Sequence, residues 1–224
     1  MPFSKAASRC PLCRSDDAAR FFTSREKSGS REFYRCSACD LVFVPERFHL
    51  DAAGQKARYL THNNDPGDAG YRDFLSRLLD PLRPLLAPGA QGLDFGAGPG
   101  PALAIMMREE GFRVRLYDPF FHPDVSALEQ TYDFITCTET AEHLAHPMRE
   151  FETLNRMLRP AGWLGVMTGM LESWDDFAGW YYHRDPTHIC FYSKATMEWL
   201  AQRFSWDVHF PRPNVVLFQK PSLS

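Results

Sequence analysis

Hydrophobic positions from residue 91 onward alternate between the spacing of strands and that of helices. Short apolar runs, typical of buried strands, lie at 91–95, 113–118, 132–137 and 162–170. Apolar residues at three- and four-residue steps, typical of amphipathic helices, lie in 101–111, 146–160 and 193–204. Strands that alternate with helices are characteristic of a parallel sheet covered on both faces. The pattern therefore predicts an open, doubly wound α/β sheet.

The two ends of this pattern carry further signals. Segment 69–88 has leucines at helical spacing, and Pro81 and Pro84 predict a kink or a break in that helix. Near the C-terminus, segments 206–210 and 215–220 both resemble strands. Only the short stretch 211–214 separates them, so they must run antiparallel. We expect a mostly parallel sheet that ends in an antiparallel C-terminal strand.

Two pairs of cysteines lie near the N-terminus, each pair with a two-residue gap: Cys10 and Cys13, then Cys36 and Cys39. Such a gap lets both thiolates of a pair reach one ion from a tight turn, and two pairs complete the four-sulfur shell of structural zinc. The apolar segments RFFTS and EFYRC, around KSGS, predict a hairpin between the pairs. We predict a zinc-ribbon-like module at 1–48 that binds Zn²⁺; a redox dithiol or a chance pairing of the cysteines is the alternative.

Composition and charge narrow the class of protein. The chain has 224 residues, 44% hydrophobic and 24% charged, which are ordinary values for a globular protein. Its net charge is −3, with nine basic and six acidic side chains in 1–50 against 16 and 22 in the remainder. This balance argues against a nucleic-acid partner. No segment resembles a secretory signal or a membrane span, so we expect a cytoplasmic protein without a membrane partner.

The glycine-rich turn after the first strand of the main domain is the first candidate for chemistry. Gly96, Gly98 and Gly100 follow a buried strand and precede a helix, a position at which backbone amides can approach a ligand closely. The next strand ends at Asp118, where a carboxylate suits the two hydroxyls of a ribose. Asp94, two residues before the first glycine, would repel a pyrophosphate and attract an ammonium group. A nucleoside with an amino-acid tail, S-adenosylmethionine, fits better than a dinucleotide.

Three segments resemble the motifs of class I S-adenosylmethionine-dependent methyltransferases. LDFGAGPG resembles their first motif and LYDPF their acidic second motif. YDFITCTETAEHL is similar to the strand-and-loop segment of the ubiquinone-biosynthesis-like branch. The resemblance covers 69–220 and implies a Rossmann-like domain, assigned here to 69–224, that transfers a methyl group.

The resemblance also implies which residues bind the cofactor. Asp94, Gly96 and Gly98 would contact the methionine end, and Asp118 the ribose. Ala97, in the glycine turn, is also implied to bind the cofactor; Pro119 and Phe120 would flank the adenine, and Thr138 and Glu139 would lie near the ligand after the fourth strand of the family fold. Segment 49–68 is predicted to be a linker or a lid, in which Tyr59, His62 and Asn63 are candidates to close over the cofactor; a plain polar linker is the alternative.

The aromatic segment WYYHRDPTHICFY, at 180–192, is the candidate acceptor site. His188 is suited to remove a proton from an acceptor hydroxyl or amine, with Asp185 as a carboxylate that orients the ring. His183 and Tyr192 are further catalytic candidates in this segment. The alternative is that these residues simply pack the domain. His143 is expected near the cofactor rather than as the base.

These features together predict a methyltransferase that acts on a small-molecule acceptor, with a structural zinc site. A zinc-guided RNA methyltransferase and a non-catalytic module that binds S-adenosylmethionine are the alternatives. The acceptor, the methylated atom and the oligomeric state stay open.

Overall fold

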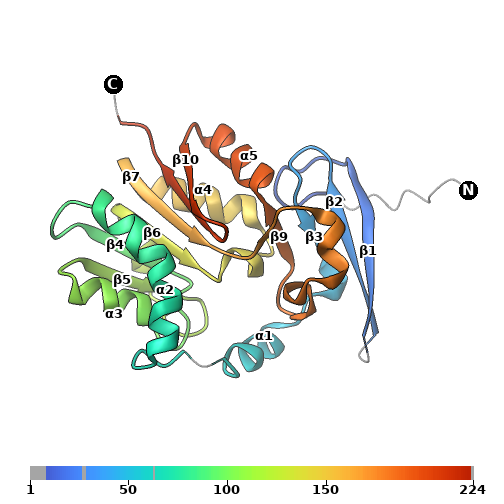
Figure 1. The fold of residues 1–224 in the computed structure, drawn as a ribbon, viewed down its shortest axis with the longest axis horizontal. Helices are drawn as coiled ribbons and strands as arrows, with labels where there is room; N and C mark the ends of the chain where they lie inside the picture. Colours follow the sequence, from blue (N-terminus) through green and yellow to red (C-terminus); the bar gives the residue numbers. More distant parts are fainter. Residues whose placement is uncertain (1–8, 27–28, 63, 223–224) are drawn as a thin grey trace, which may run out of the picture.

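Six strands form the large sheet of the protein (Figure 1). In spatial order they are β10 (Asp207–Arg212), β11 (Val215–Gln219), β7 (Leu158–Met167), β6 (Tyr132–Thr138), β4 (Gln91–Phe95) and β5 (Arg113–Tyr117). The pairs among β7, β6, β4 and β5 are parallel, whereas β11 runs antiparallel to both β7 and β10. The structure is a computed structural model that describes residues 9–26, 29–62 and 64–222. It confirms the predicted sheet and its antiparallel end.

Helices cover both faces of this sheet, as predicted. On one face, α2 (Ala69–Leu82) and α3 (Ala102–Glu109) bury Leu78 and Met107 against strand residues such as Phe134. On the other face lie α4 (Pro147–Met157) and α5 (Lys194–Phe204), which bury a second apolar cluster. The predicted break near Pro81 is the end of α2, because a short 3₁₀ turn that contains Pro84 follows it.

Two boundaries differ from the prediction. The predicted helix 146–160 ends at Met157, and β7 begins at once, because Leu158 already pairs with Tyr132 of β6. The predicted strand 162–170 ends at Met167, and Met170–Leu171 forms a separate strand, β8. β8 pairs with β9 (Cys190–Ser193) and leaves the large sheet. The sequence pattern could not separate these two strands, because both are apolar and only two residues lie between them.

A second sheet joins the N-terminal module to the rest of the chain. β1 (Ala18–Glu26) and β2 (Gly29–Cys36) form the predicted antiparallel hairpin, and β3 (Val42–Phe43) pairs with β2. β3 also pairs with β9, so that the sheet continues into a segment almost 150 residues further along the chain. The predicted division at residue 48 stays a prediction, but backbone hydrogen bonds cross it. This sheet places the N-terminal module beside the predicted acceptor segment.

The predicted lid contains a helix, α1 (Ala52–Tyr59), which Asp51 caps by accepting a hydrogen bond from the amide of Gly54. In Figure 1, α1 lies at the lower edge, between the N-terminal sheet and α2. Across the ranges that the structure describes, no helix combines the length and the apolar character that crossing a membrane would require.

Candidate functional site

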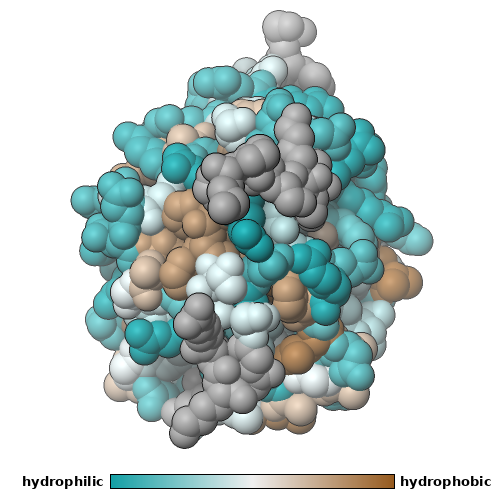
Figure 2. All heavy atoms as spheres, turned by 90° about the vertical axis from the view of Figure 1, so that its right-hand side faces the viewer, coloured by the Kyte–Doolittle hydropathy of each residue, from teal (hydrophilic) through white to brown (hydrophobic). Residues whose placement is uncertain are grey.

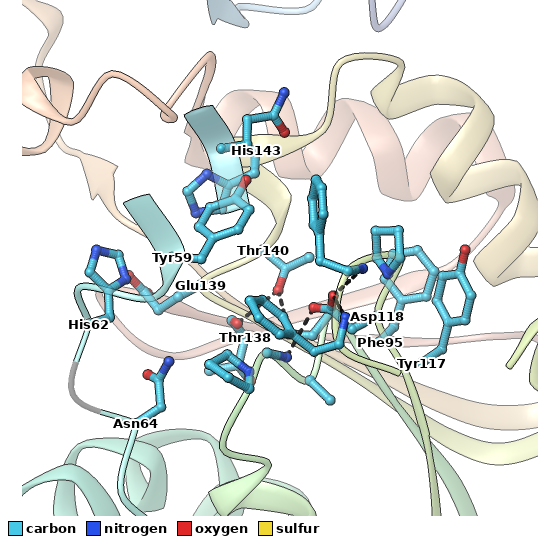
Figure 3. Close-up of a pocket in the computed structure, with 18 of the residues that line it drawn as sticks. Tyr59, His62, Asn64, Phe95, Tyr117, Asp118, Thr138, Glu139, Thr140 and His143 are labelled. Carbon is cyan, nitrogen blue, oxygen red and sulfur yellow. Dashed lines mark hydrogen bonds between the residues drawn. The ribbon is translucent and has the colours of Figure 1, made fainter. Parts of the chain in front are cut away.

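A cavity of about 320 Å³ opens at the carboxyl ends of β4, β5 and β6. This is the edge of a parallel sheet at which ligands of doubly wound folds bind. Figure 3 shows side chains from three regions around it: the strand ends, the loop after β6, and the end of α1 with the segment after it. The predicted cofactor residues that line it are Tyr59, His62, Gly96, Ala97, Gly98, Asp118, Pro119, Phe120, Thr138 and Glu139. Ten of the twelve residues predicted to bind the cofactor therefore surround one space.

The glycine turn forms the floor of this cavity. Gly96 and Gly98 have φ angles of +78° and +63°, which side chains rarely adopt. A Cβ atom on Gly96 would lie 2.3 Å from the side chain of Thr140, so no other residue fits there. The carboxylate of Asp118 accepts hydrogen bonds from the amides of Gly98, at 3.0 Å, and Phe120, at 2.8 Å. A further amide, that of Phe121, donates to the same oxygen as Phe120, at 3.0 Å. These bonds fix the carboxylate at the cavity wall, where Oδ2, which accepts only from Gly98, keeps a lone pair for a ligand hydroxyl.

Asp94 lies beneath the cavity and does not line it. It is buried, and its carboxylate accepts a hydrogen bond from Thr136 Oγ1 at 2.8 Å. Burial raises the pKa of Asp94 to about 6. A contact with the ammonium end of a ligand stays a prediction.

The last residue of α1, Tyr59, and the segment after it close one side of the cavity. The Tyr59 ring lies against Phe120, with 5.7 Å between ring centroids, and against His143, at 5.1 Å. His62 and Asn64 also line the cavity. Asn63, the third predicted lid residue, lies outside the described residues. The backbone of Asn64 packs so closely on the glycine turn that a Cβ on Gly100 would lie 2.0 Å from the Asn64 carbonyl oxygen.

A second cavity, of about 530 Å³, adjoins the first. The two cavities share the residues His62, Asn64, Tyr71, Glu139 and His143. The second one is also lined by residues of the predicted acceptor segment, among them Tyr181, Tyr182, Asp185 and His188. This arrangement provides room for two ligands that meet near Glu139 and His143.

His188 and His143 face one another at this junction, with 4.8 Å between their ring centroids. His143 Nδ1 donates a hydrogen bond to the Thr187 carbonyl at 2.9 Å, and His188 Nδ1 donates to the Tyr182 carbonyl at 2.8 Å. Burial lowers the pKa of His188, which favours its neutral form. The lone pair of a neutral ring then resides on Nε2.

Two glutamates complete the junction. Glu142 is fully buried, and its Oε2 accepts a hydrogen bond from Thr168 Oγ1 at 2.8 Å. Burial, together with the neighbouring Glu142, raises the pKa of Glu139 to about 9. The sequence analysis did not select Glu142, although it stands directly before His143 in the AEHL motif.

Asp185 contacts Arg58 rather than His188. Arg58 Nε and Nη2 donate to Asp185 Oδ2 at 3.0 and 2.8 Å, and Thr187 donates to Oδ1. Burial alone would raise the pKa of Asp185, but the hydrogen bonds from Arg58 and Thr187 outweigh this effect and hold that pKa well below its usual range. The prediction that Asp185 orients the His188 ring is therefore wrong. The Asp185 oxygens accept hydrogen bonds from Arg58 and Thr187, and Nδ1 of His188 donates to the Tyr182 carbonyl instead.

His183 and Tyr192 lie away from both cavities. His183 is buried in an aromatic cluster, where its ring stacks on Phe177 with 5.0 Å between centroids and contacts Phe33. Tyr192 is fully buried and donates a hydrogen bond to the Ala141 carbonyl at 3.0 Å. These positions do not support the predicted catalytic roles, and they agree with the alternative that both residues pack the domain.

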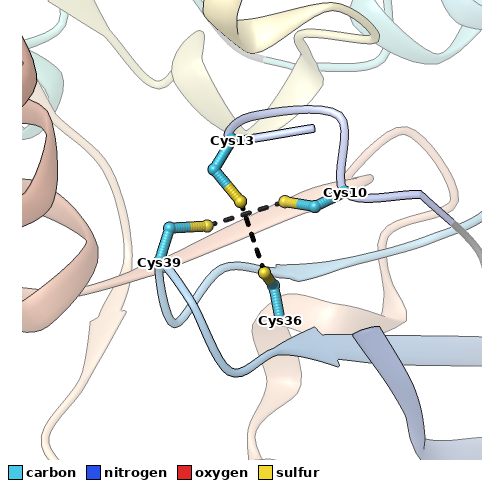
Figure 4. Close-up of side chains that lie close together, drawn as sticks. All are labelled: Cys10, Cys13, Cys36 and Cys39. Atoms are coloured by element: carbon cyan, nitrogen blue, oxygen red, sulfur yellow. Dashed lines mark hydrogen bonds between the residues drawn. The ribbon is translucent and has the colours of Figure 1, made fainter. Parts of the chain in front are cut away.

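The four N-terminal cysteines converge, as Figure 4 shows. Cys10 and Cys39 Sγ lie 3.6 Å apart, and Cys13 and Cys36 Sγ lie 3.4 Å apart. One sulfur from each residue lies within 4.8 Å of the other three. Sulfurs of a tetrahedral zinc shell, at ~2.3 Å from the metal, would lie roughly 3.8 Å apart. The donor set and its spacing thus fit a structural zinc ion.

The N-terminal module also contacts the acceptor segment directly. Arg31 of β2 donates hydrogen bonds to the carbonyls of His183, Asp185 and His188, at 3.2, 2.9 and 2.6 Å. Figure 2 views the molecule from the side of this module, and its surface is mostly hydrophilic with hydrophobic patches between. The sequence analysis missed Arg31 and Arg58, since neither residue belongs to a motif.

Comparisons with known proteins agree with this geometry. The family described as "Methyltransferase domain" matches residues 67–209. No curated protein matches the chain. A chain in the complex between the Haloferax volcanii Trm112 methyltransferase activator and a methyltransferase has a TM-score of 0.54 at 14% identity, covering 74% of this chain and 97% of that one.

Two further solved structures are similar. A SAM-dependent methyltransferase from Archaeoglobus fulgidus has a TM-score of 0.51 at 15% identity, covering 66% of this chain and 94% of that one. An O-methyltransferase family protein from Burkholderia thailandensis has a TM-score of 0.48 at 15% identity, covering 69% of this chain. The match spans only 59% of that longer protein. At such identities the first two structures show a shared fold.

Proposed function

The chain belongs to the methyltransferase-domain family, and from this premise we propose that it is an enzyme that transfers a methyl group from S-adenosylmethionine to a small-molecule acceptor. The observation that carries the proposal is the pair of adjoining cavities, one lined by the predicted cofactor residues and one by the predicted acceptor segment. S-Adenosylmethionine supplies, when bound, a methyl group on a sulfonium, whose carbon–sulfur bond breaks with its electron pair going to sulfur.

The residues of the first cavity fit the cofactor. The turn from Gly96 to Gly98 leaves space at the cavity floor, since a Cβ on Gly98 would meet nothing nearer than 3.9 Å. Asp118 would hold the ribose hydroxyls, and Tyr59 and Phe120 provide aromatic faces in the same cavity. Aromatic faces also attract a sulfonium cation. These contacts would orient the donor toward the junction of the two cavities, and alignment is the main contribution that a protein makes to such a displacement.

The acceptor would bind in the second cavity and lose its proton at the wall that carries His188, His143 and Glu142. His188, the predicted base, has its Nδ1 hydrogen-bonded to the Tyr182 carbonyl, which leaves Nε2 as the proton acceptor. Asp185 is a positioning residue in this proposal. Its hydrogen bonds with Arg58 and Thr187 hold the predicted acceptor segment, which carries His188, in place. The aromatic rings of Tyr181 and Tyr182 at the same cavity favour a flat acceptor.

A structural zinc ion at Cys10, Cys13, Cys36 and Cys39 would support this site from outside. Four protein ligands leave no open position on the metal, so the ion has no direct part in the reaction. Its contribution would be to hold β2 and β3, which contact the acceptor segment through Arg31 and β9.

RNA as the acceptor receives less support. An RNA methyltransferase needs a basic surface that leads to the pocket. At the second cavity Arg58 already pairs with Asp185, and the chain as a whole has a net charge of −3. The assignment to the ubiquinone-biosynthesis-like branch rests on residues 132–144 alone, and the cytoplasm stays the predicted location.

Two measurements test the proposal. Calorimetry should show that the protein binds S-adenosylhomocysteine and that Asp118→Asn weakens this binding at least tenfold, with Asp207→Asn, at the far edge of the sheet, as the unaffected control. Incubation with methyl-labelled donor and a cell extract should then place the label in the small-molecule fraction. Label in RNA would refute the small-molecule acceptor, and failure to bind S-adenosylhomocysteine would refute the cofactor assignment.

A further inference from the structure

Three side chains with metal-ligand atoms converge where the two cavities meet. Glu142, His143 and His188 each offer one such atom, and these atoms all lie within 4.8 Å of one another. Glu142 and His143 follow β6, whereas His188 belongs to the segment between β8 and β9. Two distant parts of the chain therefore bring two imidazoles and a carboxylate to one point, beside the predicted acceptor position.

The hydrogen bonds of both imidazoles define which nitrogen is free to bind a cation. Nδ1 of His143 and Nδ1 of His188 each contact a backbone carbonyl, at 2.9 and 2.8 Å. A carbonyl oxygen can only accept, so each Nδ1 carries the hydrogen and each Nε2 has the lone pair. Histidines that bind metals have this arrangement, in which the second nitrogen donates to a carbonyl or carboxylate and fixes the ring.

The carboxylate between them lacks a partner for one oxygen. Glu142 is fully buried, and its Oε1 has no hydrogen-bond partner within the part of the chain that the structure describes. His143 Nε2 lies 3.8 Å from this oxygen, which is beyond hydrogen-bond distance, and it has a lone pair rather than a hydrogen. A buried carboxylate oxygen left in this state is costly. The three groups together are acceptors that face one another, and a cation would satisfy all of them.

We propose that Glu142, His143 and His188 bind a divalent first-row cation, with Zn²⁺ as the reference ion. Two imidazoles and one carboxylate are a ligand set that such cations prefer. Ligand atoms ~2.1 Å from a tetrahedral ion lie about 3.4 Å apart, so the three side chains would need to close by about 1 Å. The set provides three ligands instead of the four of the cysteine site, and an ion held this way keeps a position open toward the second cavity.

This open position specifies the class of acceptor, an inference that rests on the proposed function. An acceptor hydroxyl that binds the ion becomes more acidic, as water does on zinc. Its O–H bond breaks, the proton leaves to solvent water, and the electron pair stays on oxygen. That pair then forms the bond to the methyl carbon while the carbon–sulfur bond breaks toward sulfur. With the ion bound, His188 is a ligand rather than the base: the ion lowers the pKa of the hydroxyl, and solvent water takes the proton. The acceptor is thus an alcohol, phenol or enol.

Metal analysis of the full-length protein tests the site without an activity measurement. After equilibration with Zn²⁺ and removal of free metal, the wild-type protein should contain about two zinc ions per chain, one for the cysteines and one for the new site. Glu142→Gln and His143→Gln should each reduce this to about one, while His209→Asn, an exposed histidine outside the site, should keep about two. Circular dichroism of each variant reports whether it folds, and two variants at different ligands guard against a folding defect in one.

Co²⁺ provides a spectroscopic readout of the same site. When zinc fills the cysteine site first, added Co²⁺ should produce visible ligand-field bands without the thiolate charge-transfer band of a sulfur shell. Glu142→Gln should lose these bands. A wild-type protein that holds about one zinc and shows no such bands would overturn the proposal.

Calorimetry with S-adenosylhomocysteine on the same samples separates this proposal from the proposed function. Binding of that compound without a second metal would refute the metal site alone, and a second metal without such binding would refute the cofactor assignment alone. If the labelled product is a methylated amine, formed at an undiminished rate in the presence of a chelator that leaves the cysteine zinc bound, the oxygen acceptor is wrong, because an ammonium group would then be the cation that the cluster binds.

Discussion

Arg58 and Asp185 connect the predicted lid to the predicted acceptor segment. The guanidinium of Arg58, near the end of α1, donates two hydrogen bonds to one carboxylate oxygen of Asp185, at 3.0 and 2.8 Å. The residue next to Arg58 is Tyr59, which lines the cofactor cavity, and Asp185 lies three residues before His188. One ion pair therefore holds a wall of each cavity in place.

Replacement of Arg58 by Met should loosen both walls. The pair is partly exposed on the arginine side, so we expect a loss of about 1 kcal/mol, or roughly fivefold weaker binding of S-adenosylhomocysteine. Calorimetry measures this change. Arg83→Met is the control, since Arg83 forms a comparable surface pair with Glu110 far from the cavities. Equal affinities of the wild-type protein and Arg58→Met would show that α1 is held by other contacts.

Arg31 provides a second and separable prediction. Its guanidinium donates to three carbonyls of the acceptor segment, and Arg31 is not among the residues that line the cofactor cavity. Arg31→Met should therefore lower kcat or raise KM for the acceptor about tenfold, because three hydrogen bonds to charge disappear, while the affinity for S-adenosylhomocysteine stays unchanged.

Arg20→Met is the matched control for this variant, because Arg20 lies on the neighbouring strand β1 and pairs only at the surface with Glu32. A parallel loss of cofactor affinity in Arg31→Met would indicate a general folding defect instead of a local effect on the segment.

The buried carboxylate of Asp94 predicts a pH-dependent stability difference. Burial raises its pKa in the folded protein to about 6, against about 4 in the unfolded chain. The folded state thus holds the proton more tightly, and ionisation of Asp94 removes stability as pH rises from about 4 to about 6. Above about pH 6, the ionised Asp94 lowers the free energy of unfolding by its full amount, on the order of 3 kcal/mol. The asparagine of Asp94→Asn does not ionise, so this variant avoids that loss of stability.

Urea denaturation of both proteins at pH 4 and at pH 7 measures the difference. The free energy of unfolding of Asp94→Asn relative to the wild-type protein should increase between these two values, whatever the other titrating groups contribute, because they are common to both proteins. A constant difference would show that Asp94 has an ordinary pKa in the folded protein.

Removal of metal from the cysteine site should affect the acceptor before the cofactor. β3 contributes to the same sheet as β9, and the sheet lies next to the segment that carries His188. We expect Cys36→Ser to contain about one zinc fewer per chain and to lose most methyl transfer. Binding of S-adenosylhomocysteine should persist, since α2, α3 and one face of the large sheet form a core that contains no residue of the module. Full activity of a zinc-free variant would contradict the supporting role of the module.

Much of the site could be predicted from local sequence. The glycine turn, Asp118 and the two cysteine pairs are contiguous motifs whose chemistry depends on spacing along the chain, and the structure places them as expected. The choice among His143, His183 and His188 could not be made in this way. His183 and His188 are only five residues apart, yet one packs among phenylalanines and the other faces the cavity.

The sequence by itself determined the elements and the local motifs, because hydrophobic periodicity and residue spacing are set by the backbone of a single strand, helix or turn. The tertiary structure alone decided which distant groups meet: Glu142 with His188, Arg58 with Asp185, and β3 with β9. Such contacts depend on how the sheets and connecting segments pack around the whole core, and no local rule of periodicity or spacing encodes them.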